Sequence, residues 1–177
     1  MPFPRPKTTD SEDVLYEYAV GALARRMRSV AELKRLLRPR VEADTEYGKT
    51  LVELVIRRLK DQGYLNDAKY AAAFSSFRRD NEKFGHRRVI TDLKAKGVHG
   101  EVIDKAVASV YDEVNEERQA RDYLHRKRLQ KPRSQKDAAR VFRQLMRAGF
   151  ASKTIFAILK KWDVDDETLT ALEGELD

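Results

Sequence analysis

The apolar pattern of this chain repeats at a nearly constant distance, and this repeat limits the fold more than any single motif. The string LKAKGV at 93–98 is matched 52 residues later by LMRAGF at 145–150. The apolar residues that follow the string at 93–98 recur 52 residues later, after the string at 145–150. They also have counterparts 51 residues earlier, which are Val52, Val55, Ile56 and Leu59. A period of about 50 residues is typical of small helical units that complete their cores by stacking.

Within each period, apolar residues recur at spacings of three and four, which is the pattern of amphipathic helices. We expect three units of three helices at residues 11–65, 66–111 and 112–162. A flexible proline-rich arm at 1–10 precedes them, and an acidic tail at 163–177 follows. The predicted fold is therefore all-α, with three tandem three-helix repeats in an elongated array. The alternative is a compact bundle of nine helices whose similarity is accidental.

Local signals define several helix ends. Ser29 and Glu32 have the spacing of a capping box, in which each side chain satisfies a backbone amide of the other residue. Gly63, Gly97 and Gly149 each follow an apolar helical pattern, and glycine commonly ends helices because it tolerates the left-handed conformation. The third unit should begin with a long basic helix at roughly 113–129.

Some apolar residues outside the clearest stripes are also assigned to packing. Tyr64 and Leu65 are expected to pack at the junction between two units, and Phe77 to lie on the apolar face of the helix that follows Asn66. Leu169 and Leu172 allow a weak helix in the acidic tail. We interpret this tail either as a solubilising cap or as a segment that folds over the basic body.

No catalytic or metal-binding pattern stands out. The chain has no cysteine, which excludes a disulfide framework, a zinc-thiolate cluster and a cysteine nucleophile. Its three histidines are scattered, and Gly48-Lys49-Thr50 lacks the glycine that a phosphate-binding loop needs where Ala43 stands. We expect no enzyme, no metal and no cofactor. No apolar run approaches the length of a membrane span, so the predicted location is the cytoplasm.

The charge distribution suggests a polyanionic partner. The net charge is +7, but residues 1–162 carry +14 and residues 163–177 carry −7. A basic body favours binding to nucleic acid or to an acidic protein surface. A solvated helical surface that is merely basic is the alternative interpretation.

Lysine and arginine also recur at helical spacing, so that they form cationic faces that could follow a phosphate backbone. The most regular set lies at spacings of four, three and four residues, which places its members within about 60° of one another on a helix: Lys136, Arg140, Arg143 and Arg147. Shorter sets occur in the other units: Lys34 with Arg38, Arg87 with Lys94, and the line Arg118, Arg121, His125 and Arg128.

Several motifs together resemble the RecX family of bacterial regulatory proteins, which modulate the RecA recombinase. The resemblance covers about residues 12–162 and rests on these strings: Ser29-x-x-Glu-Leu33-x-x-x-Leu37, Gly63-Tyr64-Leu65-Asn66-Asp67 with Tyr70-Ala71, Arg87-Arg88 to Leu93-x-x-Lys96-Gly97-Val98, and Leu145-x-x-Ala-Gly149-Phe150. Arg88 and Lys96, which lie within these strings, join the candidate partner-binding residues.

The resemblance implies a curved array that binds the RecA filament on single-stranded DNA along its groove. It implies inhibition of the RecA ATPase and of strand exchange, blocked filament growth, and a role in DNA repair, recombination and the SOS response, without enzymatic activity of its own. We expect a monomer that contacts RecA and can also contact DNA directly. Two rival hypotheses are a stand-alone nucleic-acid-binding module and a helical adaptor for an unrelated acidic protein.

Overall fold

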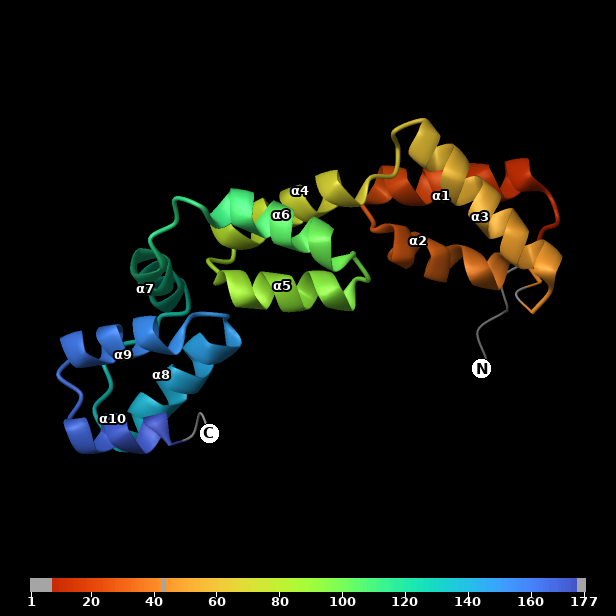
Figure 1. Ribbon diagram of the computed structural model, residues 1–177. Helices are drawn as coiled ribbons and strands as arrows, with labels where there is room; N and C mark the ends of the chain where they lie inside the picture. The colour runs from red at the N-terminus through yellow and green to blue at the C-terminus, as the bar shows by residue number, and fades with distance from the viewer. Residues whose placement is uncertain (1–7, 43, 175–177) are drawn as a thin grey trace. The chain divides into compact units, whose positions relative to one another are not determined.

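The computed structural model describes residues 8–42 and 44–174, and every regular element in these ranges is helical (Figure 1). This confirms the predicted all-α class. The elements are α1 (Glu12–Arg25), α2 (Val30–Leu37), the short 3-10 helix η1 (Arg38–Arg40), α3 (Glu46–Asp61), α4 (Asp67–Asp80), α5 (His86–Ala95), α6 (Gly100–Tyr111), α7 (Glu116–Arg126), α8 (Gln135–Arg147), α9 (Ser152–Lys161) and α10 (Asp166–Glu173). Most of the predicted arm, residues 1–7, lies outside the described residues, and Thr9 donates its amide to the Arg40 carbonyl at 2.7 Å.

The chain divides into two compact units. One comprises the residues up to 71 together with 93–103, and the other comprises 72–92 together with the residues from 104 onwards. The three helices α4, α5 and α6 therefore each contribute to both units. The division into three sequence repeats remains a prediction from the pattern.

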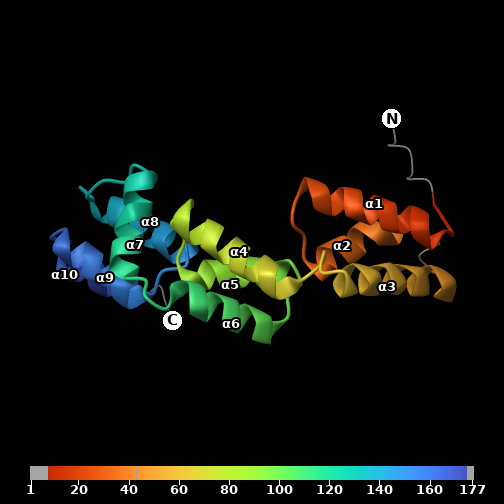
Figure 2. The ribbon, with the colours of Figure 1, turned by 90° about the horizontal axis from the view of Figure 1, so that it is seen from above.

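The core of the first unit is formed by one apolar face from each of its first three helices. In this unit α1 packs against α2 and α3 (Figures 1 and 2). The spacing of three and four residues places the apolar side chains on one face of each helix. The fully buried members are Leu15, Ala19, Ala22, Leu33, Leu37, Val55 and Leu59.

The core of the second unit joins four helices, and one of them lies in the segment expected as a tail. Helix α10 begins at the cap Asp165, whose side chain accepts the Thr168 amide at 2.8 Å. Leu169 and Leu172 are buried in the same cluster as the apolar residues of α7, α8 and α9. The acidic segment therefore supplies part of the core, and Asp163 pairs with Lys131 at 2.7 Å.

Two of the expected packing assignments are wrong. Tyr64 and Phe77 are 63% and 55% exposed, while their neighbours Leu65 and Ser75 are buried. Along α4 the buried residues are Tyr70, Ala71 and Ser75, so a small polar side chain is interior while Phe77 faces solvent.

The three glycines that were predicted to end helices have the left-handed backbone conformation, and two of them also allow a close approach to another helix. Gly63, Gly97 and Gly149 have φ of 75°, 74° and 91°. A side chain at Gly97 would overlap Ala31, and one at Gly149 would overlap the backbone of Arg88. The turns that follow α5 and α8 thus each pack against the start of an earlier helix.

Hydrogen bonds at corresponding positions hold both turns. In the first unit the Ser29 hydroxyl donates to the Lys96 carbonyl at 2.6 Å. In the second unit the Gly85 amide donates to the Ala148 carbonyl at 2.9 Å. The repeated apolar pattern is thus accompanied by a repeated helix-to-turn contact within each unit.

Candidate partner-binding surface

The regular cationic set lies on the exposed face of α8. Ser134 caps this helix by accepting the Asp137 amide at 3.2 Å. Val141, Phe142 and Leu145 are buried on one side, and the four cations are exposed on the other: Lys136, Arg140, Arg143 and Arg147. Because like charges at this spacing repel one another, the face is suited to an anionic partner.

Four of the other candidate cations are held by internal carboxylates. Lys34 pairs with Glu53 at 2.6 Å, Arg88 with Asp92 at 3.0 Å, and Lys96 with Glu32 at 3.1 Å. Arg121 pairs with Glu117 one helical turn earlier. An ion pair already present must be exchanged or extended before such a residue can bind a partner.

The remaining candidates are exposed. Arg38 lies in unit one at the start of η1, Lys94 on the part of α5 that belongs to the same unit, and Arg87 on the part of α5 that belongs to the second. Within residues 8–42 and 44–174, no carboxylate pairs with Arg38, Arg87, Lys94, Arg118, Arg128, Lys136, Arg140 or Arg147.

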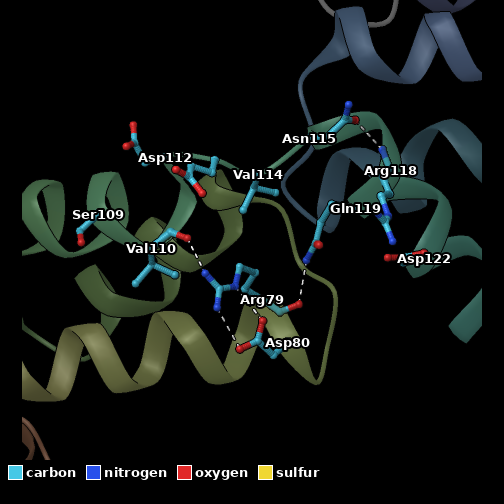
Figure 3. Close-up of a pocket in the computed structure, with 11 residues that line it drawn as sticks. Arg79, Asp80, Ser109, Val110, Asp112, Val114, Asn115, Arg118, Gln119 and Asp122 are labelled. Atoms are coloured by element: carbon cyan, nitrogen blue, oxygen red, sulfur yellow. Dashed lines mark hydrogen bonds and ion pairs between the residues drawn. The ribbon is translucent and has the colours of Figure 1, made fainter.

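The expected line of cations along α7 is interrupted. The helix spans Glu116–Arg126 rather than 113–129, and Arg128 lies beyond its end with φ of 54°. Arg118 faces a hollow of about 610 Å³ (Figure 3). The acidic members of its lining outnumber the arginines: Asp80, Asp112, Glu113 and Asp122 against Arg79 and Arg118. This hollow does not suit a phosphate.

The hollow beside Arg118 lies instead where hydrogen bonds join α4 to α6 and α7. The Arg79 guanidinium donates to the Val110 carbonyl at 2.6 Å and pairs with Asp80 at 2.7 Å. Gln119 of α7 donates to the Arg79 carbonyl at 2.7 Å (Figure 3). These bonds fix the end of α4 to α6 and α7 within the second unit.

Four of the motif residues that carry the family resemblance meet in a half-buried cluster of the first unit: Ser29, Glu32, Asp67 and Lys96. The predicted capping box is present, with the Ser29 amide donating to Glu32 and the Glu32 amide donating to Ser29. Asp67 accepts the amide of Val30 at 2.8 Å. Lys96, from the turn after α5, donates to the second oxygen of Glu32.

The electrostatics of this cluster favour an ionised Glu32. Burial on its own would raise the pKa of the Glu32 carboxyl, but hydrogen bonds from the Ser29 amide and from Lys96 outweigh it and lower the pKa. Burial, followed by the charge of Glu32, raises the pKa of the Tyr70 phenol. Lys96 therefore stabilises the first unit through Glu32.

Sequence reasoning missed the long-range partners in this cluster and one further cation, Lys127. The capping box had identified Glu32, but not its contact with Lys96, which lies 64 residues away. The signal for Lys127 was present in the basic run from His125 to Arg128. Glu32 and Lys96 are too far apart in sequence for a local pattern to pair them, and only tertiary packing brings them together.

The described ranges contain neither a candidate membrane span nor a candidate metal site. No helix there is both long and apolar enough to cross a membrane. No group of three or more His, Cys, Asp or Glu side chains in those ranges is placed to hold a metal ion.

The all-α fold, the repeated helix-to-turn contacts and the exposed cationic face of α8 define a helical protein with a basic surface. The model of the RecX second three-helix domain matches residues 66–107. Regulatory protein RecX of Mycobacterium leprae is 32% identical over 160 residues, which cover 88% of this chain and 90% of that protein. Regulatory protein RecX of Leptothrix cholodnii is 32% identical over 82% of this chain and 87% of its own length. The chain belongs to the RecX family of regulatory proteins.

Solved structures agree on the fold. A crystal structure of a regulatory protein RecX superimposes with a TM-score of 0.63 at 24% identity, covering 85% of this chain and 71% of that one. RecX from Lactobacillus salivarius gives a TM-score of 0.64 at 20% identity, covering 86% of this chain and 96% of its own.

Proposed function

We propose that this protein binds the RecA filament on single-stranded DNA and inhibits its ATPase, strand exchange and growth. The observation that carries the proposal is the family membership, shown by relatives called regulatory protein RecX that are 32% identical over most of the chain. The regulated process would be DNA repair and recombination, in the cytoplasm. The protein would act by binding, as a monomer, rather than by catalysis.

The proposed mechanism is steric and electrostatic. The protein would contact more than one filament subunit and so oppose filament growth. Exposed cations on α8 would face DNA phosphates or acidic protein groups, since Lys136, Arg140 and Arg147 have no carboxylate partner among the described residues. Arg87 and Lys94 on α5 would add to this contact.

The test is an ATPase assay of RecA on single-stranded DNA, titrated with the protein. The wild type should inhibit, and the double variant Arg140→Glu/Arg147→Glu should need at least about tenfold more protein for half inhibition. A matched control reverses two exposed lysines of α9, Lys153→Glu/Lys160→Glu, with the same change of net charge. Equal inhibition by both variants would remove the role given to α8, and no inhibition by the wild type would refute the proposed function.

A stand-alone nucleic-acid-binding module is the second candidate, favoured by Lys136, Arg140 and Arg147 of α8, which pair with no carboxylate of the described ranges. Binding to bare single-stranded DNA should be compared with binding to RecA-coated DNA over a salt titration. A strong preference for the coated filament supports the regulator. Equal affinities with a steep salt dependence would support the stand-alone module, and no binding to either would leave the adaptor for an acidic protein.

A further inference from the structure

A second cationic site is concave and combines residues from three segments of the second unit. Arg88 of α5, Lys127 after α7 and Arg147 at the end of α8 line a hollow of about 350 Å³. Its other walls include the rings of Phe84 and Tyr123 and the amide of Gln144. Its size is within the range of small-ligand sites.

Backbone contacts hold two of these cations in place. Because Gly149 has no side chain, the turn after α8 can approach the backbone of Arg88 closely. The Arg88 guanidinium then donates to the Arg147 carbonyl at 3.4 Å, and the Arg147 guanidinium donates to the Arg143 carbonyl at 3.2 Å. A guanidinium has five N–H donors, so both retain donors for a ligand.

The charge in and around this hollow is positive. Arg88 pairs with Asp92, but Lys127 and Arg147 pair with no carboxylate of the described ranges. Burial raises the pKa of the Tyr123 phenol, and the positive charges of Arg147, Arg88 and Arg126 act in the opposite direction. These cations therefore act together on the Tyr123 hydroxyl.

Two aromatic rings and one amide without a partner for its oxygen belong to the lining of the hollow. The rings of Phe84 and Tyr123 lie 6.0 Å apart. The Arg88 guanidinium lies 5.6 Å from the Phe84 centroid, and the Lys127 ammonium 5.9 Å from that of Tyr123. The Oε1 atom of Gln144 is buried without a hydrogen-bond partner, although a buried acceptor normally has one.

We propose that this hollow binds one nucleotide of single-stranded DNA, with its phosphate between Lys127 and Arg147 and its base against the ring of Phe84. The Gln144 side chain would turn so that Oε1, which is buried in the free protein, accepts an N–H group of the base. A carboxylate side chain of a protein partner would use the cations but would leave the aromatic rings and the Gln144 acceptor unused, so the lining favours a nucleotide. The inference rests on the proposed DNA-bound target and adds a concave site that shares only Arg147 with the exposed face of α8.

The test uses bare DNA, so that it is independent of RecA. Binding of a short labelled deoxycytidine oligonucleotide is measured by fluorescence anisotropy over a range of salt. Lys127→Gln should weaken binding about fivefold and lower the salt slope by about 0.7, the value for one phosphate contact on a single strand. The control Lys153→Gln removes an exposed lysine of the same unit and should leave both quantities unchanged.

The base contact is tested separately with an abasic strand of equal length. The wild type should bind it about fivefold more weakly, a loss at the low end for one stacked base. Gln144→Met should reduce that difference without lowering the thermal midpoint, because it removes an acceptor that has no partner.

Equal binding by Lys127→Gln and Lys153→Gln, or no binding by the wild type, would overturn the site. Equal affinity of the wild type for the two strands would overturn the nucleotide assignment. None of these outcomes affects the ATPase assay, so failure of this inference and failure of the proposed function are distinguishable.

Discussion

Glu32→Ala should destabilise the first compact unit by roughly 2–3 kcal/mol. The Glu32 side chain is only 13% exposed and pairs with Lys96. The substitution removes the capping interaction with the Ser29 amide, worth about 1 kcal/mol, and a charged hydrogen bond worth about 1.5 kcal/mol or more. Lys96 keeps a quarter of its side chain exposed, so water can solvate part of its charge and the loss should not reach that of a fully buried pair.

The assay is urea unfolding followed by circular dichroism at neutral pH. The matched control is Glu53→Ala in the same unit, whose carboxylate also pairs with a lysine but is 61% exposed. Exposed pairs contribute about 0–1 kcal/mol, so this control should cost well under half as much. Equal losses from the two variants would refute the reasoning that burial and the capping contact make Glu32 important.

The pH dependence provides a second measurement on the same residue. The folded protein lowers the pKa of Glu32 below its usual value of 4.5, so its contribution is present above pH 4.5 and is lost as the pH falls through the lower, folded value. The difference in stability between the wild type and Glu32→Gln should therefore shrink below pH 4.5. A difference that grows on acidification would contradict the sign of this shift.

Three further substitutions test the packing through the free energy of unfolding. Gly149→Ala should lower the free energy of unfolding more than Gly63→Ala. Both glycines have positive φ, but only a side chain at Gly149 would overlap the backbone of another segment. Equal losses would contradict this overlap. Leu172→Ala should cost about 2–5 kcal/mol, whereas Leu54→Ala, which is 46% exposed, should cost far less; the reverse order would contradict the placement of α10 in the core. Tyr111→Phe should cost about 1 kcal/mol, since its hydroxyl donates to a main-chain carbonyl at 2.8 Å, and an unchanged midpoint would show that water replaces this bond.

Local pattern predicted the helices well, because helix formation depends on neighbours along the chain. The spacing of Ser29 and Glu32 identified a capping box that the structure contains. The glycines at 63, 97 and 149 were predicted to end helices and have positive φ. The four cations of α8 were predicted to share one side of a helix, and they are exposed opposite its buried face.

The same local pattern could not determine which side chains are buried where several helices pack together. Phe77 lies on the solvent side of α4 while Ser75 is fully buried. The two leucines of the acidic segment looked too few for more than a weak helix, yet they complete the core of the second unit. Which apolar side chain is buried depends on the neighbouring helices, and helix periodicity does not include them.

By itself, therefore, the sequence determined the all-α class, the positions of most helices, the repeated pattern and the resemblance to the RecX family. Periodicity, caps and glycine stops act over a few residues and can be read without coordinates. Only the tertiary structure decided that Lys96 pairs with Glu32 and that Arg88, Lys127 and Arg147 surround one hollow. Residues tens of positions apart meet only after the helices have packed, because long-range contacts depend on how whole helix faces fit together.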